Sequence, residues 1–420
     1  MGTTLLKVLN AHYTVVETGY ERPMPIVHVF GRDRHRRRHH VEVEGYRPYF
    51  CVPAEMAMDS LQALENDENV LGVEWDDCCG RQEVGIEGTP LARIVCEQPR
   101  HVGQLREHFV STDSSTSSST VGAGTETAAK GDDGEDGPQQ GHYEADVRFA
   151  DRFLIDMGIR QVARVPSDCD DRRIIPDEIH GVDSDEHSEV ANVRPRICYF
   201  DIEVKQSDRG PSVVSETGIE RAPNPITSIC AFDSYERAYR LWTLAHDSWG
   251  DGQWDEACDV GFNVPIADHS VYTNEGELLR DFVVWVRDSD PSLLTAWNIG
   301  FDAPYLVNRC INENVVAVQK LSPTRDVSSM NGSGNWINSD LKGRILFDML
   351  QGYEKTQVHE LDSYSLDAVA SKELDIDKLD VEDIDAVWES DPRRFQQYVL
   401  RDVQALVGIN ERSLEQGCIV

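Results

Sequence analysis

The sequence predicts two folded parts, an α+β, β-rich N-terminal domain and an α/β domain with a mixed sheet. The first 110 residues contain five short segments of strand character and two of helical character. From residue 191 onward, strand-like segments alternate with amphipathic helical segments. Between the two parts lies a Ser/Thr/Gly-rich tract without hydrophobic periodicity, which is typical of a disordered insertion.

In the N-terminal part, two alternating segments flank a polar loop and predict a β-hairpin. A third strand follows closely, then a helical segment, two more strands and a second helical segment. The predicted strands are 26–30, 40–45, 47–52, 70–75 and 91–96, and the predicted helices are 54–66 and 101–109.

The C-terminal part begins with RICYFDIEV, residues 196–204, which reads as a buried strand. The final helix is predicted over 391–415, with Asp391 as its cap and Pro392 at its first position. Further strands are expected at 225–232, 238–244, 291–298 and 343–350, and further helices at 274–290, 301–314 and 363–374.

These elements set the expected domain boundaries. The N-terminal domain covers 1–110, the disordered insertion 111–141, an acidic connecting segment 142–190 and the second domain 191–420. The sequence has no apolar run of eighteen residues and no basic-then-apolar signal at its start. We therefore expect a soluble, cytoplasmic protein that has no membrane partner.

The charge is strongly one-sided, with 75 acidic residues against 40 Lys and Arg and a net charge of −35. Only eight of the basic residues are Lys. Such a surface suits multimolar salt, where self-repulsion is screened to within about 3 Å, so we interpret the charge as a halophilic habitat. The ten cysteines are scattered without zinc-site spacing, which favours reduced thiols.

Two carboxylates lie near the end of the buried strand 196–204. Side chains alternate along a strand, so Asp201 and Glu203 share one face, opposite the apolar face. Like charges beside a core are unfavourable unless a cation holds them. This pair therefore indicates a bound cation.

Two further segments supply acids in comparable places. Asp302 follows a predicted strand directly, in WNIGFDAPYL, and Tyr398 and Asp402 lie one turn apart on the last helix. Four converging acids suit two Mg²⁺ or Mn²⁺ ions, which activate water and stabilise the leaving oxygen in phosphoryl transfer. With a pKa near 10, the Tyr398 hydroxyl fits an orienting role better than that of a general base.

The order DIE, then NxxxFD, then YxxxD resembles the three exonuclease motifs of B-family DNA polymerases, in particular of archaeal, halophile-like members. The resemblance implies a ribonuclease-H-like fold and a proofreading 3′→5′ exonuclease of the DEDD type with a tyrosine. It implies that Tyr398 positions the attacking water and that Asn298 and Phe301 support the site or the 3′-terminal nucleotide. The implied metal ligands are Asp201, Glu203, Asp302 and Asp402.

The loop 31–40, GRDRHRRRHH, concentrates five Arg and three His in an acidic protein. One interpretation is contact with phosphates or a single strand, through Arg36, Arg37 and Arg38. The other is a solvated hairpin tip. The residues leave both open.

The polymerase signatures of the family, a D-x-x-S-L-Y-P-type stretch and a Y-x-D-T-D pair, are absent from these 420 residues. We therefore expect an exonuclease that acts on DNA 3′ ends of a primer–template. Three origins stay open for the chain: a fragment, a split-gene subunit whose palm, fingers and thumb lie on a separate polypeptide, and a truncated product. Two alternatives stay open: a free-standing DEDD nuclease acting on RNA or single-stranded DNA, and a non-catalytic DNA-binding or scaffold fragment of a split polymerase.

Overall fold

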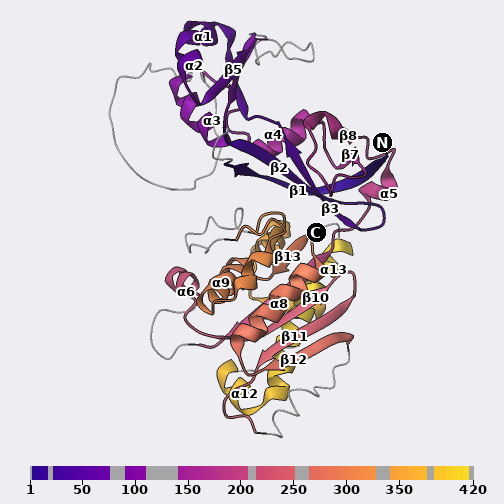
Figure 1. Ribbon diagram of the computed structural model, residues 1–420. Helices are drawn as coiled ribbons and strands as arrows, with labels where there is room; N and C mark the ends of the chain where they lie inside the picture. Colours follow the sequence, from indigo (N-terminus) through magenta and orange to yellow (C-terminus); the bar gives the residue numbers. More distant parts are fainter. Residues whose placement is uncertain are drawn as a thin grey trace. The chain divides into compact units, whose positions relative to one another are not determined.

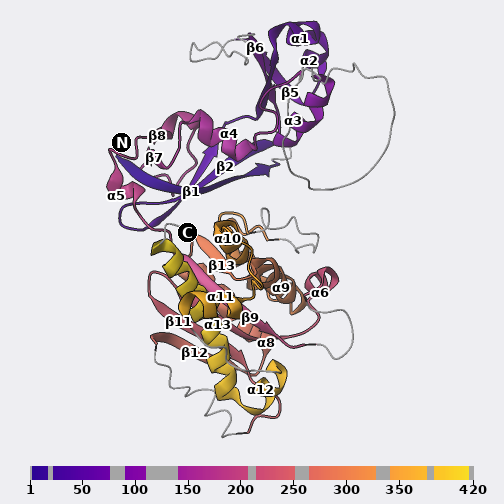
Figure 2. The ribbon, with the colours of Figure 1, turned by 180° about the vertical axis from the view of Figure 1, so that it is seen from behind.

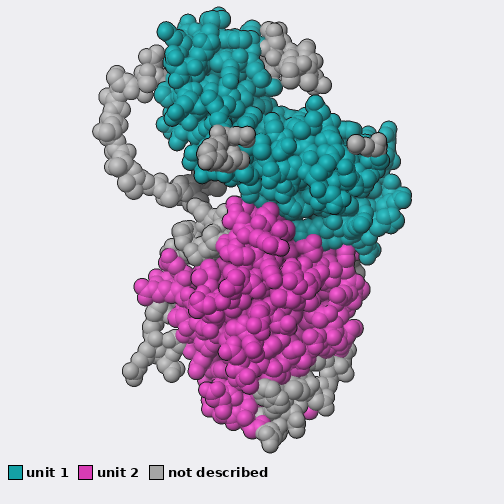
Figure 3. Space-filling model, in the orientation of Figure 1, with its two compact units in different colours: residues 1–193 teal, residues 194–420 magenta. Residues whose placement is uncertain are grey.

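The protein forms two compact units, residues 1–193 and 194–420, which Figure 3 colours separately. The structure is a computed structural model of the chain. It describes residues 2–17, 22–75, 90–109, 141–206, 214–250, 264–327, 341–375 and 383–415. The predicted low-complexity insertion, 111–141, lies outside the described residues except for Gly141.

The first unit contains a five-stranded sheet and a three-stranded sheet (Figure 1). The predicted hairpin is present as β2 and β3, which pair antiparallel. In the larger sheet the order is β3-β2-β1-β7-β8, with bounds Arg38–Glu44, Met24–Arg32, Thr3–Val16, Val162–Pro166 and His180–Val182. The smaller sheet has the order β4-β6-β5, with bounds Tyr49–Pro53, Leu91–Cys96 and Val70–Glu74.

Short helices complete the first unit. The residues that connect the two predicted domains belong to it, because β7 pairs with β1 along residues 162–166. Phe149 and Phe153 of α4 pack into the same core as Val27 and Val29 of β2. The helices are α1 (Ala54–Asp59), α2 (Leu61–Asn66), α3 (Pro99–Arg106), η1 (Glu107–Phe109), α4 (Phe149–Asp156), η2 (Pro176–Glu178) and α5 (Ser188–Ala191).

The second unit is built on a six-stranded mixed sheet, as the sequence predicts. β9 (Ile197–Val204) pairs antiparallel with β10 (Ile226–Asp233) and parallel with β13 (Leu293–Ala296). β10 pairs antiparallel with β11, and the two outer pairs, β11 with β12 and β13 with β14, are parallel. The remaining bounds are Ala238–Leu244 for β11, Ile266–Tyr272 for β12 and Ile345–Asp348 for β14.

Helices cover both faces of this sheet. On one face, α8 (Glu275–Ser289), α9 (Ile299–Asn312) and η3 (Val316–Leu321) share a core with Phe200 and Ile202 of β9 (Figure 1). On the other, α10, α11, α12 and α13 pack around Tyr199, and Figure 2 shows α11 and α13 on that side. Their bounds are Met349–Thr356, Leu366–Leu374, Ile384–Ser390 and Pro392–Glu415, and α6 spans Glu216–Arg221.

The structure can be compared with several details predicted from the sequence. The Asp391 carboxylate accepts a hydrogen bond from the Arg394 backbone amide at 3.0 Å, and Pro392 is the first helical residue of α13. Within the segment 343–350, only Ile345–Asp348 is a strand, and α10 begins at Met349. The six described free cysteines are all buried. Among the described residues, no helix is both long and apolar enough to cross a bilayer.

Candidate active site

Strand β9 presents its two carboxylates on one face of the sheet. Phe200 and Ile202 point into the core formed with α8 and α9, whereas Tyr199 points into the core formed with α13. Because side chains alternate, Asp201 and Glu203 lie on the α13 face, as the sequence predicts. Both side chains are partly buried.

Asp302 reaches the same edge of the sheet through β13 and α9. β13 runs parallel to β9, so both strands end at one edge, and α9 starts directly after β13. Asp302 is in the first turn of α9 and is 4% exposed. Its carboxyl accepts a hydrogen bond from the Ile202 backbone amide, which ties the helix to the strand between Asp201 and Glu203.

Helix α13 supplies the last two predicted residues. Tyr398 and Asp402 are one turn apart, and the Tyr398 hydroxyl donates a hydrogen bond to the Asp402 carboxylate. Two buried polar contacts fix the helix on the sheet. The Asn410 amide donates to the Tyr199 hydroxyl at 2.6 Å, and the Gln396 amide donates to Thr243 Oγ1 at 2.5 Å.

Three carboxylates, two from β9 and one from α13, lie close together. Asp201, Glu203 and Asp402 each offer an oxygen within 4.8 Å of the others. Asp302 lies outside this closest group, yet burial, and after it the charge of Asp201, raises the pKa of Asp302. The four predicted acids are thus brought into one neighbourhood from three separate stretches of sequence.

The electrostatics of the site favour a bound cation. Burial raises the pKa of Asp201 to about 7. Burial, followed by the charges of Asp201 and Asp402, raises the pKa of Glu203 well above its usual value. A set of oxygen ligands that disfavour one another's ionisation fits hard divalent ions such as Mg²⁺ or Mn²⁺. The residues present therefore fit a metal centre.

Tyr398 and Asp402 form a hydrogen-bonded pair, as donor and acceptor, next to these carboxylates. Burial and the charges of Asp201 and Asp367 raise the pKa of Asp402, while the Tyr398 hydrogen bond and Arg401 act to lower it. Burial, and then the charges of Asp402 and Glu203, raise the pKa of the Tyr398 phenol far above neutral pH. Tyr398 thus keeps its proton and serves as a hydrogen-bond donor.

Asn298 and Phe301 flank the site without joining the carboxylate group. Asn298 is the exposed cap residue of α9, and its carbonyl accepts hydrogen bonds from the Phe301 and Asp302 amides. Phe301 is partly buried, packs against the α8–α9 core and lies 5.3 Å from the Tyr305 ring. Phe301 thus serves as a packing ring of this core.

The three arginines of the loop 31–40 lie in the first unit. Arg36 and Arg37 are exposed at the tip of the β2–β3 hairpin. Arg38 is partly buried, with its guanidinium 4.9 Å from the centre of the Phe30 ring. The loop is therefore held by ring and backbone contacts at its base and exposed at its tip.

Three further acids act on the site and were not among the predicted residues. The charge of Asp385 raises the pKa of Glu203, and that of Asp348 raises the pKa of Asp302. Asp367 acts on Asp402. Asp348 lies near the end of the predicted strand 343–350, which was a usable signal. Asp367 and Asp385 lie in the first turns of short helices in acid-rich sequence, and nothing local distinguishes them.

Comparison with known proteins places the chain among polymerase sequences. The family model of the DNA polymerase family B exonuclease domain matches residues 140–369. This range contains Asp201, Glu203 and Asp302, and it ends before Tyr398 and Asp402. The last two residues are therefore assigned from the sequence motif and from geometry, without the family match.

Individual relatives agree with the family match. The chain is 30% identical to the DNA-directed DNA polymerase of Escherichia phage RB69 over 237 residues, which cover 52% of this chain and 25% of the relative. It is 26% identical to a DNA polymerase of Thermococcus aggregans, over 91% of this chain and 17% of the relative. The chain thus spans a quarter or less of these two relatives.

A solved structure resembles the whole fold. The family B DNA polymerase of Pyrobaculum calidifontis matches with a TM-score of 0.63 at 21% identity, over 98% of this chain and 46% of that chain. At this identity the match supports the fold alone. The ribonuclease-H-like fold implied by the sequence resemblance is confirmed.

Proposed function

The chain belongs to the exonuclease-domain family of family B DNA polymerases, whose model matches more than half of it, and we propose that it removes nucleotides from DNA 3′ ends. The reaction would be the two-metal hydrolysis of the terminal phosphodiester during proofreading. The alternatives, a nuclease for RNA or a non-catalytic scaffold, are less favoured because the matching family and relatives are DNA polymerases.

One observation carries the proposal. Asp201, Glu203 and Asp402 bring carboxylate oxygens within 4.8 Å of one another, beside the buried Asp302. These residues would hold two Mg²⁺ or Mn²⁺ ions. The bound ions would activate the attacking water and stabilise the leaving 3′ oxygen.

The remaining residues have roles that follow from their chemistry. Tyr398 stays protonated, so its hydroxyl would donate a hydrogen bond to the attacking water or the scissile phosphate and orient it. Asn298 and Phe301, at the start of α9, would border the 3′-terminal nucleotide. Exposed Arg36 and Arg37, with Arg38 behind them, would contact phosphates of the DNA.

Polymerisation is not assigned to these 420 residues, because the polymerase signatures are absent from the sequence. Adding deoxynucleoside triphosphates to the purified chain should therefore produce no primer extension.

The test is excision of a mismatched 3′-terminal nucleotide from a primer–template, with Mg²⁺ and high salt. The wild type is compared with Asp201→Ala/Glu203→Ala, and Glu360→Ala/Asp362→Ala is the matched control that removes two exposed acids of the same unit. We expect metal-dependent release of single nucleotides by the wild type and the control, and none by the site variant. Equal release by all three proteins would locate the activity elsewhere, and faster cleavage of RNA than of DNA would favour the free-standing nuclease.

A further inference from the structure

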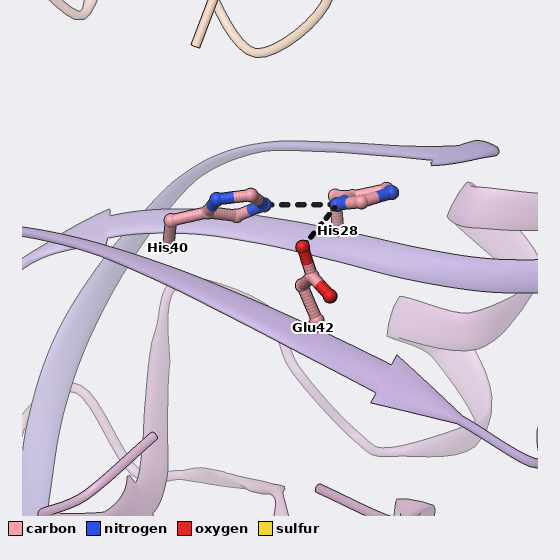
Figure 4. Close-up of side chains that lie close together, drawn as sticks. All are labelled: His28, His40 and Glu42. Carbon is pink, nitrogen blue, oxygen red and sulfur yellow. Dashed lines mark hydrogen bonds and ion pairs between the residues drawn. The ribbon is translucent and has the colours of Figure 1, made fainter. Parts of the chain in front are cut away.

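A second group of metal-ligating side chains lies in the first unit, on the large sheet (Figure 4). His28 is on β2, and His40 and Glu42 are on β3. The β2–β3 register places His28 directly opposite Glu42, and His40 shares the face of Glu42 two residues away. One ligand atom from each residue lies within 4.8 Å of the other two.

The distances within the group are close to those of a metal site. His28 Nδ1 forms a hydrogen bond of 2.8 Å with His40 Nε2 and lies 3.9 Å from Glu42 Oε1. In a tetrahedral zinc site with bonds of 2.0–2.1 Å, neighbouring ligand atoms are about 3.3 Å apart. The two separations bracket this value, and an ion bound by all three residues would replace the hydrogen bond between the two imidazoles.

The outer atoms of two of the ligands are held by other residues. The second imidazole nitrogen of His28, Nε2, lies 2.8 Å from the Thr14 hydroxyl of β1. The Arg173 guanidinium donates to Glu42 Oε2 at 3.0 Å, which leaves Oε1 directed at the histidines. Hydrogen bonds of this kind orient metal-binding histidines and carboxylates in proteins.

The burial of the group also suits a bound ion. His28 is 5% exposed, so a bound ion would be shielded from solvent on one side.

We propose that His28, His40 and Glu42 bind a zinc-class divalent cation that fastens β2 to β3. Two imidazoles and one carboxylate form a ligand set that zinc accepts, with a fourth position for water. The all-oxygen group of the second unit selects hard ions instead. The two centres therefore differ in the metal they take, and the zinc site is independent of the exonuclease proposal.

A neighbouring group of similar composition serves as a contrast. His39, on the opposite face of β3, lies near Cys169 and Asp170. Both imidazole nitrogens of His39 already face carboxylates, Asp170 at 2.7 Å and Asp33 at 3.4 Å. Burial raises the pKa of the Cys169 thiol to about 12, which keeps it protonated. This group fits a structural histidine rather than a metal site.

The test is titration of the metal-free, full-length chain with Zn²⁺ by calorimetry, in the Asp201→Ala/Glu203→Ala background so that the other centre does not contribute. We expect one tightly bound Zn²⁺ per chain. His28→Gln and His40→Gln should each weaken binding more than 100-fold, and Thr14→Val about 10-fold, the lower end for an outer partner. His39→Gln should bind as the parent does.

Three results of the titration would overturn the zinc proposal. Absence of a tight site in the parent, unchanged affinity in both His28→Gln and His40→Gln, or loss confined to His39→Gln would each contradict it. Circular dichroism of the metal-free variants checks their folding. If a histidine variant fails to fold, Glu42→Gln, which keeps the side-chain shape, is titrated in its place. This variant should also weaken Zn²⁺ binding more than 100-fold.

Discussion

The Asn410 amide donates a 2.6 Å hydrogen bond to the Tyr199 hydroxyl and so joins α13 to β9, two residues before Asp201. Asn410 is 0% exposed and Tyr199 is 4% exposed, so water does not replace this contact. The bond fixes the face of α13 that carries Tyr398 and Asp402 toward β9. The position of the last helix is therefore part of the construction of the carboxylate site.

Tyr199→Phe tests this connection. Removing the hydroxyl leaves the buried Asn410 amide without its acceptor, which should lower the free energy of unfolding by about 1–3 kcal/mol and reduce excision. Tyr46→Phe is the control, because the buried Tyr46 of the first unit also donates a side-chain hydrogen bond, partly buried, to Asp156 at 2.6 Å. Urea unfolding and excision rates are measured together. Equal excision rates in the two variants would argue against a positioning role for the Asn410–Tyr199 bond.

Tyr398→Phe should slow excision about 10²-fold, the size typical of one positioned hydrogen-bond donor. Metal affinity should change little, because the four carboxylates remain. Single-turnover excision with saturating Mg²⁺ measures the first effect and metal titration the second. Tyr364→Phe, whose hydroxyl accepts a hydrogen bond from the Leu361 amide at 3.2 Å, is the control. An unchanged rate in Tyr398→Phe would remove the hydroxyl from the chemistry.

The raised pKa of Asp201 predicts an inverse pH dependence of stability in the metal-free protein. Its pKa rises from 3.8 to about 7 in the folded state, so between these values the folded chain binds more protons than the unfolded chain. Stability contributed by this group is therefore lost as pH rises from about 4 to 7, by up to about 1.4 kcal/mol for each pH unit in that interval. Asp201→Asn should remove that loss.

Urea unfolding in the presence of EDTA at pH 5 and pH 8 measures this effect. The difference in unfolding free energy between Asp201→Asn and wild type should be larger at pH 8. Excess Mg²⁺ should stabilise the wild type more than the variant at pH 8. Identical pH slopes for the two proteins would contradict the assigned protonation.

The net charge of −35 predicts a strong dependence of stability on salt. Screening of the acidic surface should raise the thermal midpoint as KCl increases from about 0.1 M to multimolar concentrations. An uncharged osmolyte at matched water activity separates screening from preferential exclusion. Maximal stability and activity at low salt would overturn the interpretation of the charge as an adaptation to salt.

The arginine hairpin predicts a change in the salt dependence of DNA binding. Replacing Arg36, Arg37 and Arg38 with Ala should reduce the slope of log affinity against log salt by about 2 for single strands. The control is Arg280→Ala/Arg287→Ala, which removes exposed cations from α8. Fluorescence anisotropy with labelled DNA over a salt series measures the slope for the hairpin variant and for the control. An unchanged slope would leave the loop as a solvated hairpin tip.

The sequence predicted those parts of the site in which the periodicity of a single strand or helix determines which side chains are neighbours. Alternation along β9 placed Asp201 beside Glu203, and helical spacing placed Tyr398 above Asp402. It did not predict β1, Thr3–Val16, as the central strand of the larger sheet, because pairing with β2 and β7 depends on contacts distant in sequence. Asp385 was missed for the same reason, since its effect on Glu203 arises only from the packing of α12.

The most direct test of the central claim uses Asp402, because this residue is assigned from geometry and lies outside the family match. The measurement is the single-turnover rate of nucleotide release from a 3′-labelled mismatched primer with Mg²⁺, for wild type and Asp402→Asn. The four-carboxylate centre predicts a loss of about 10²–10³-fold or more, comparable to removal of a principal group that stabilises the transition state. A variant that releases nucleotides at the wild-type rate would contradict that centre.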